Sequence, residues 1–414
     1  MTDISNKNTK IFKNGVMLMI FQIAKIVFPF VTLPYLTRIF TTDTYGTVTY
    51  TKTIMNYMQI FVDFGFVLSA TKDIVNCKGD NKKIGTISGD TLVARIILGL
   101  FGFIVTDILC LCLPILRANT LFVMLSYSVV FLSVFLMDFL FRGLEIMHVI
   151  TIRFILMKTI STVLTFFLIK DDSQILLIPI LDIISSLAAI GLVFIEIKKR
   201  NIKLRITKLS SIVAKINDSF IYFISSAAST SLNALSTIII GIYGSATDVA
   251  HWGLAMQIIG TITALYNPFC DSIYPEMVRS KKLSLVTKTV KMFLPVVVVG
   301  CIASYFASGL IFKILGGEKY LEAIPIFRLL IPVLFFGFLS MLYGWPTLGA
   351  IGKQRSVTAA TVVSVLFNLA SMIILPIFGM FTLAAVGIIR VLTEVLLSGI
   401  RIYLTVKYHR CFSH

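Results

Sequence analysis

The stretch QIAKIVFPFVTLPYLTRIFTTDTYGTVTYTKTIMNYMQIFVDFGFVLSATK, residues 22–72, predicts the class of this protein. It indicates two long apolar helices joined by a short turn. The polar residues of each helix recur every three or four positions and so share one face. These residues are Gln22, Lys25, Pro29 and Thr32 on the first helix, and Thr49, Thr53, Asn56 and Asp63 on the second. Such a stripe on an otherwise apolar helix is typical of a membrane protein in which it faces a wet cavity. Lys25 has an alternative, because its long side chain could extend to the cytoplasmic membrane surface.

The composition of the whole chain also indicates a polytopic membrane protein. Its 414 residues are 57% hydrophobic and 14% charged, and the mean hydropathy is +0.93, values typical of membrane proteins. A net charge of +17 would suggest nucleic-acid binding in a soluble chain. Here most of the basic residues lie in predicted cytoplasmic segments, as is usual for a membrane protein. We therefore predict no nucleic-acid partner. The six cysteines and four histidines show no metal or catalytic spacing. We therefore predict no cofactor, no metal and no enzymatic activity.

Twelve stretches reach the length of about 20 residues that a bilayer requires. They cover residues 14–34, 45–70, 86–112, 120–141, 149–169, 175–196, 217–243, 249–275, 292–314, 323–348, 355–379 and 381–406. The basic flank before the first stretch runs into it without a small-residue cleavage site, so we expect no cleavable signal peptide.

The lysines and arginines predict the orientation of these spans. With a cytoplasmic N-terminus, 25 of the 37 fall in inner segments, 5 in outer segments and 7 within spans. Cytoplasmic loops of membrane proteins carry this excess of positive charge. We therefore predict that the N- and C-termini are both cytoplasmic.

The sequence predicts that the chain divides into two related halves. A basic cytoplasmic linker, 201–216, separates a six-helix bundle at 1–200 from a second at 217–414, and we expect the linker to contact anionic lipid headgroups. A shift of 207 places Gly46 on Gly253 and Lys72 on Arg279, which favours a parallel repeat. The second half also carries polar stripes, with Tyr222, Ser226, Ser229, Thr230, Asn233 and Thr237 on one helix and Gln257, Thr261, Pro268 and Asp271 on the next. Alternatively, these hydroxyl groups bond only to their own or neighbouring helices.

Several segments resemble bacterial O-antigen flippases, of the polysaccharide-transporter branch of the multidrug/oligosaccharidyl-lipid/polysaccharide exporter superfamily. These are LPYLTRIFTTDTYGTVTY at 33–50, FVDFGFVLSATKDI at 61–74, FRGLEIM at 141–147, IYPEMVR at 273–279, GAIGKQR at 349–355 and the helix around Glu394. The chain departs from the family in having Ile39-Phe40 after Arg38, where the family usually has Leu-Gly. It also has Arg142 where the family often has glutamine.

The resemblance implies an all-α polytopic membrane protein in the bacterial inner membrane, with twelve transmembrane helices in two pseudo-symmetric six-helix bundles around a central cavity. It implies that an oligosaccharide on undecaprenyl pyrophosphate moves from the cytoplasmic to the periplasmic leaflet by alternating access. Membrane lipids and other polysaccharide assembly proteins are further candidate partners. Sugars require hydrogen-bonding walls and the pyrophosphate requires positive charge. The predicted substrate-binding residues are Lys25, Gln22, Arg38, Asn56, Asn233, Gln257 and Asp271, with Lys25 the first candidate for the pyrophosphate.

Charged residues at membrane depth suggest ion coupling, for which Asp63 and Glu394 are the candidates. Glu394 lies four residues after Arg390, so a structural ion pair along one helix face is the favoured alternative. For Arg153 and Lys158 we expect side chains that extend to the membrane surface.

Two rival functions remain at this stage. A drug or cation antiporter of the same superfamily would share the architecture. A membrane polysaccharide polymerase has a similar number of spans, but it would need a long external loop with catalytic residues. No predicted external loop is longer than roughly a dozen residues, which is below the usual length of loops with a function of their own.

Overall fold

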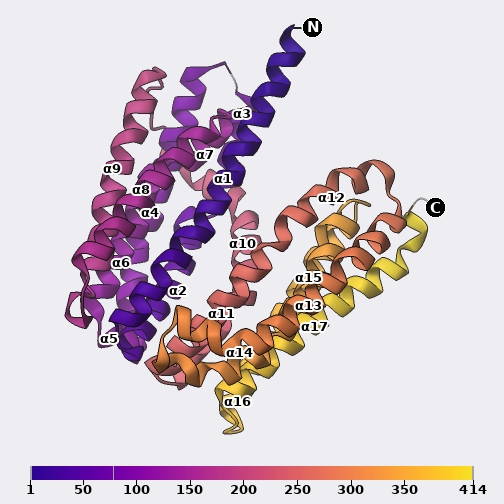
Figure 1. Cartoon of the computed structure of the whole chain (residues 1–414). Helices are drawn as coiled ribbons and strands as arrows, with labels where there is room; N and C mark the ends of the chain where they lie inside the picture. Colours follow the sequence, from indigo (N-terminus) through magenta and orange to yellow (C-terminus); the bar gives the residue numbers. More distant parts are fainter. Residues whose placement is uncertain (1, 78, 413–414) are drawn as a thin grey trace. The chain divides into compact units, whose positions relative to one another are not determined.

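The computed structural model describes residues 2–77 and 79–412, without the side chains of 2–12, 225, 229, 232, 233 and 271. The described residues form helices joined by turns, without a β-strand (Figure 1). The first helices are α1 (Thr2–Ile39), α2 (Thr42–Asp63), α3 (Phe66–Asn76), α4 (Asn81–Cys112), α5 (Pro114–Arg117), α6 (Thr120–Leu132), η1 (Ser133–Leu136), α7 (Asp138–Gly143), α8 (Met147–Leu168), η2 (Asp172–Gln174) and α9 (Leu177–Lys199). They are followed by α10 (Leu209–Tyr243), α11 (Ala246–Ala264), α12 (Tyr266–Ser280), α13 (Leu283–Leu315), η3 (Glu318–Ala323), α14 (Ile324–Leu330), α15 (Pro332–Leu342), η4 (Tyr343–Gly349), α16 (Gln354–Ile377), α17 (Leu383–Lys407) and η5 (His409–Cys411).

The chain folds into two compact units. Unit 1 comprises Met1–Phe40 and Thr51–Ala227, and unit 2 comprises Thr41–Tyr50 and Ala228–His414. The long helices α2 and α10 therefore contribute to both units. The six-helix halves at 1–200 and 217–414 remain a prediction from the sequence.

Nine helical segments of the described chain are long and apolar enough to cross a membrane. They correspond to nine of the twelve predicted spans. The other three predictions, 45–70, 217–243 and 249–275, are spans with polar stripes. The first is divided between α2 and α3 and the third between α11 and α12. The second lies in the continuous helix α10, and several of its side chains are outside the described residues. The chain is thus an all-helical, multi-pass membrane protein, and twelve spans remain a prediction.

Helix breaks interrupt two predicted spans of unit 1. The span 45–70 ends its first helix at Asp63, and Phe64 and Gly65 follow with φ angles of 42° and 78°. A β-carbon at Gly65 would lie 2.5 Å from the β-carbon of Tyr222, so glycine is required by both the backbone angle and the space. The span 120–141 is interrupted after α6 by the 3₁₀ turn η1 and by Met137, with a φ of 49°.

The internal offset of 207 residues recurs in the backbone. It relates the break at Met137 to the break at Gly344, where ψ is −116°. It also relates Glu145, with a φ of 58°, to Gly352, with a φ of 80°. The helices after these turns, α8 and α16, begin at Met147 and Gln354, again 207 residues apart. These equivalences support a repeat between the later part of unit 1 and the later part of unit 2.

The predicted basic linker begins as an extended strap, residues 201–208, along the start of α4. The amide of Arg205 donates to the carbonyl of Gly85 over 3.1 Å. The carboxylate of Asp90, which is 2% exposed, accepts bonds from the amide and the hydroxyl of Thr207 at 2.8 and 2.9 Å. Ile202 is buried with the core of unit 1. The backbone of the strap is therefore fixed to unit 1.

Candidate functional site

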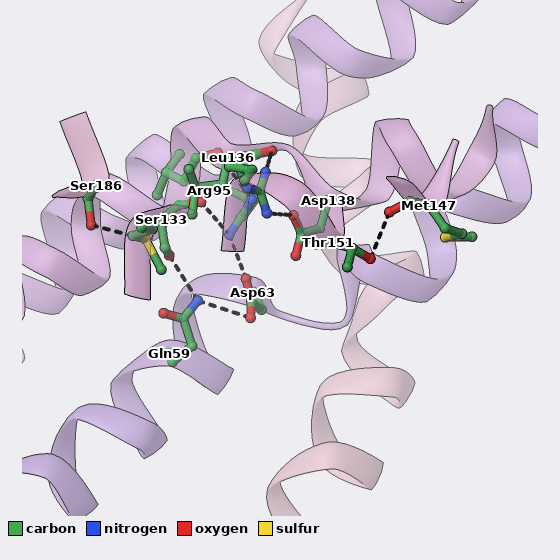
Figure 2. Close-up of polar contacts among 12 residues, drawn as sticks. Gln59, Asp63, Arg95, Ser133, Leu136, Asp138, Met147, Thr151 and Ser186 are labelled. Atoms are coloured by element: carbon green, nitrogen blue, oxygen red, sulfur yellow. Dashed lines mark hydrogen bonds and ion pairs between the residues drawn. The ribbon is translucent and has the colours of Figure 1, made fainter. Parts of the chain in front are cut away.

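The break between α6 and α7 leaves backbone carbonyls that two buried arginines satisfy (Figure 2). Arg95 on α4 donates to Val134 O over 3.1 Å, and Arg153 on α8 donates to Leu136 O over 2.5 Å. Both side chains are at most 5% exposed. A carbonyl without its helical partner is costly in an apolar setting, so these bonds stabilise the break.

Each arginine also forms an ion pair with one aspartate. Arg95 Nη2 lies 2.5 Å from Asp63 Oδ1, at the end of α2. Arg153 binds Asp138, the first residue of α7. Gln59 donates to Asp63 over 3.0 Å and to the hydroxyl of Ser133 over 2.9 Å, as Figure 2 shows. The charge cluster joins the helices α2, α4, α7 and α8 of unit 1 at the two helix breaks. We define it as Gln59, Asp63, Arg95, Ser133, Asp138 and Arg153.

Lys25 lies beside the charge cluster on α1. Its side chain is exposed, and its ammonium lies 4.7 Å from the centroid of the Phe21 ring. Because side chains on a helix point towards its N-terminus, this contact places the ammonium one turn before Cα of Lys25. Lys25 interacts electrostatically with Asp138, Arg142 and Asp63. Its predicted site role stays a prediction, but its neighbours are now known.

The other predicted substrate-binding residues are placed in part. Gln22 and Asn56 are exposed in unit 1, as is Arg38 at the end of α1. Gln257 is half-buried on α11 of unit 2. Asn233 and Asp271 have side chains outside the described residues.

Some hydroxyl groups of the polar stripes bond to their own helices. Thr32 donates to the carbonyls of Phe28 and Pro29, and Thr261 donates to that of Gln257. These bonds are of the kind that the alternative expects, and the orientation of the stripes towards a cavity stays a prediction.

Glu394, the second candidate for ion coupling, belongs to a buried network in unit 2. Its carboxylate accepts a bond from Arg390 Nη1 at 2.8 Å, the pair that the spacing predicts, and one from the hydroxyl of Ser340 at 2.6 Å. Arg401 donates to Ser340 O over 2.6 Å and to the hydroxyl of Thr361 over 3.0 Å. Ser340 lies just before the break at Gly344, so an arginine again satisfies a carbonyl where a helix is interrupted.

The sequence did not reveal the partners in the charge cluster. Arg153 was expected to extend to the membrane surface, and this is wrong: its side chain is 5% exposed and is paired with Asp138. The expectation also fails for Lys158, whose ammonium lies 3.2 Å from Asp182. Asp182 joins α8 to α9, because it also accepts a bond from Ser161. These pairs connect different helices, so no local spacing marks them.

Among the described residues, no group of three or more His, Cys, Asp and Glu side chains is arranged to hold a metal ion.

Known proteins are similar to this chain over most of its length. The family described as "Polysaccharide biosynthesis protein" matches residues 11–281. A protein of Escherichia coli (strain K12) named "Putative O-antigen transporter" is 22% identical over 398 residues, covering 94% of this chain and 95% of its own. A protein of the same name from Shigella dysenteriae is 24% identical over 269 residues, covering 64% and 67%.

Two solved structures show the fold. The lipid II flippase MurJ, in an inward closed conformation, has a TM-score of 0.73 at 12% identity and covers 96% of this chain and 87% of its own. An inward-facing multidrug resistance transporter of the MATE family has a TM-score of 0.70 at 12% identity, and 94% of each chain is covered. With a family match over more than half its residues, the chain belongs to the polysaccharide biosynthesis protein family.

Proposed function

We propose that this protein is a flippase for O-antigen oligosaccharide units on undecaprenyl pyrophosphate. It moves them from the cytoplasmic to the periplasmic leaflet of the bacterial inner membrane by alternating access. The observation that carries the proposal is the similarity over 94% of the chain to a relative named as an O-antigen transporter. Relatives of this class are transporters, and the proposed function has no enzymatic step.

The architecture that this function requires is part of the proposal. It consists of twelve spans in two six-helix bundles around a central cavity, with cytoplasmic termini. Polar side chains such as Gln22, Asn56 and Gln257 supply hydrogen bonds to sugars, and Lys25 supplies charge for the pyrophosphate. Asp63 and Glu394 remain the candidates for ion coupling. Membrane lipids and other polysaccharide assembly proteins are the proposed partners.

The function is tested by deletion in the bacterium that carries the gene. Deletion should abolish surface glycan, seen as a ladder on a lipopolysaccharide gel, and lipid-linked oligosaccharide should accumulate in the cytoplasmic leaflet. A plasmid copy of the gene should restore the ladder at a membrane level of protein checked by immunoblot. An unchanged ladder in the deletion strain, with no second gene of this family in that strain, would reject the proposal.

A drug or cation antiporter is the second candidate, favoured by the fold shared with the MATE transporter. It predicts efflux of cationic dyes such as ethidium and higher drug tolerance on expression. Both should be absent if the protein is a dedicated flippase, and dye efflux without any effect on surface glycan would favour the antiporter.

A further inference from the structure

One of the two tryptophans of the chain is exposed on a segment that is otherwise mostly buried. Trp252 is fully buried, whereas Trp345 is 54% exposed. Trp345 belongs to η4, near the end of the apolar segment Pro332–Gly349. That segment is 61% buried within the protein, the highest share among the nine described segments, and the others reach 44% at most. A large exposed ring on such a segment marks a place where a ligand can bind.

The ring of Trp345 is supported by a glycine. A β-carbon at Gly349 would lie 3.0 Å from Cε3 of Trp345 and 3.7 Å from its Cδ2, so the missing side chain lets the indole lie against the backbone. Gly344, directly before Trp345, interrupts the helix with a ψ of −116°, and Pro346 follows directly after it. Because proline has a fixed φ angle, the backbone on both sides of Trp345 is restricted and the ring has a defined position.

A polar side chain lies against the same glycine. Gln354 Nε2 donates to Gly349 O over 3.3 Å, which leaves the amide oxygen of Gln354 to accept a bond from a ligand. The neighbouring Lys353 Nζ lies 4.5 Å from the centroid of the Tyr408 ring and so connects this turn to the end of α17. Both residues belong to the segment GAIGKQR, 349–355, one of those that resemble O-antigen flippases. The predicted topology places this segment on the cytoplasmic side.

We propose that Trp345 and Gln354 form a carbohydrate subsite at the cytoplasmic end of unit 2, which binds a pyranose ring of the lipid-linked cargo. The C–H groups on one face of a pyranose are slightly positive and pack against the negative face of an indole. The amide of Gln354 bonds to the hydroxyl groups at the edge of the same sugar. The inference rests on the proposed function and deepens it, because it names residues that contact the sugar part of the cargo before translocation.

The environment of Trp345 is tested by fluorescence of the full chain in nanodiscs of phosphatidylcholine. Because the chain has two tryptophans, the emission that is lost in Trp345→Phe is that of Trp345. Acrylamide in the buffer should quench this emission strongly, and phosphatidylcholine with brominated acyl chains should quench it weakly. Tryptophans also gather at membrane surfaces, where the ring contacts lipid. Stronger quenching by brominated lipid than by acrylamide would show that the ring faces lipid and would overturn the subsite.

Binding of sugar is tested with two probes in the same nanodiscs, undecaprenyl pyrophosphate that carries one N-acetylglucosamine and undecaprenyl pyrophosphate without a sugar. Trp345→Leu should weaken binding of the glycosylated probe by about two- to tenfold, the range for one aromatic contact. It should leave binding of the bare probe unchanged. Trp345→Phe should retain more affinity than Trp345→Leu because it keeps an aromatic face, and Gln354→Ala should also weaken only the glycosylated probe. Equal binding of that probe by Trp345→Leu and the wild type would reject the subsite.

Two glycine variants separate the position of the ring from its presence. Gly349→Ala displaces the indole without removing it, so it should weaken binding of the glycosylated probe. Gly399→Ala is the matched control in unit 2, because no heavy atom would lie within 4 Å of its new β-carbon, and it should bind as the wild type does. Thermal midpoints show that each variant is folded. An equal loss of affinity for both probes in Gly349→Ala and Trp345→Leu would count against a subsite for sugar.

The proposed function can fail separately from the subsite. A preference for the glycosylated probe that depends on Trp345, without any effect of gene deletion on surface glycan, would keep the subsite and reject the flippase. Loss of surface glycan on deletion, together with an unchanged preference for the glycosylated probe in Trp345→Leu, would keep the flippase and reject the subsite.

Discussion

At the residue scale, the two buried arginines of unit 1 each connect a carboxylate to the carbonyls of a broken helix. Arg95 binds Asp63 on one side and Val134 O on the other. Such a residue cannot be replaced by an apolar one of similar volume without losing both connections. Removal of one partner also leaves a buried charge without compensation, which is the costly case for an internal ion pair.

We therefore predict unequal effects for the two partners. Arg95→Met should lower the free energy of unfolding by about 3–5 kcal/mol, the range for breaking a buried pair. Asp63→Asn also leaves the charge of Arg95 without a carboxylate. It should still cost less, because Arg95 keeps its bonds to the carbonyls of Val134 and Ser133 and asparagine can still accept from Gln59. Denaturation of the purified chain in detergent measures both. A larger loss for Asp63→Asn than for Arg95→Met would contradict the assignment of Arg95 as the connecting residue.

Glu394 allows a separate prediction in unit 2. Its bonds to Arg390 and Ser340 support a structural role, so Glu394→Gln should lower the thermal midpoint of the protein. Glycan display, scaled to the amount of folded protein, should keep its dependence on external pH. A variant that is as stable as the wild type and has lost the pH dependence would instead identify Glu394 as a proton carrier.

The ion pairs also show what a sequence can reveal at this scale. The pair of Arg390 and Glu394 follows from their spacing of four on one helix. By contrast, Arg95 and Asp63 come from different helices, and their contact depends on the break after α2. The polarity of Lys25 was visible in the sequence, but its electrostatic interaction with Asp138 depends on the packing of α1 against α8.

At the element scale, the strap formed by residues 201–208 is the first part of the basic linker that the sequence predicts. Its path depends on Gly85 and Gly89, where a β-carbon would lie 2.1 Å from the carbonyl oxygens of Lys203 and Arg205. The side chains of Lys203 and Arg205 are exposed. The strap thus presents positive charge from a fixed backbone. Hydropathy detects long apolar helices well, but it does not detect an extended segment held by glycines and one buried aspartate.

We predict that Gly89→Ala loosens the strap. The added methyl group should cost about 1–3 kcal/mol by overpacking, which raises the population of the open segment by about 5- to 150-fold. Limited trypsin digestion of inside-out vesicles should then cleave after Arg205 faster than in the wild type. Gly191→Ala is the control, because no heavy atom would lie within 4 Å of its new β-carbon. Equal cleavage of Gly89→Ala and the wild type would show that the strap does not depend on this contact.

At the scale of the whole molecule, two independent features indicate an internal repeat. The offset of 207 residues was found from glycines and basic residues in the first part of each half. In the structure the same offset relates the helix break at Met137 to that at Gly344, and the turn at Glu145 to that at Gly352. A glycine is not needed at every equivalent position, so the sequence alone shows the repeat only weakly.

The repeat and the distribution of charge together predict the topology, which is the last prediction. Reporter fusions after Lys83, Lys208 and Lys353 should show a cytoplasmic location, because each follows or lies within a segment rich in Lys and Arg. Fusions after Asp172 and Lys319 should show a periplasmic location, since five and nine predicted spans, both odd numbers, separate these sites from the cytoplasmic N-terminus. Alkaline phosphatase and green fluorescent protein fusions, made in parallel at each site, give opposite signals and control for expression. A periplasmic signal at Lys208 would contradict the division into two halves of six spans, because the strap and the basic segment around it form the centre of that arrangement.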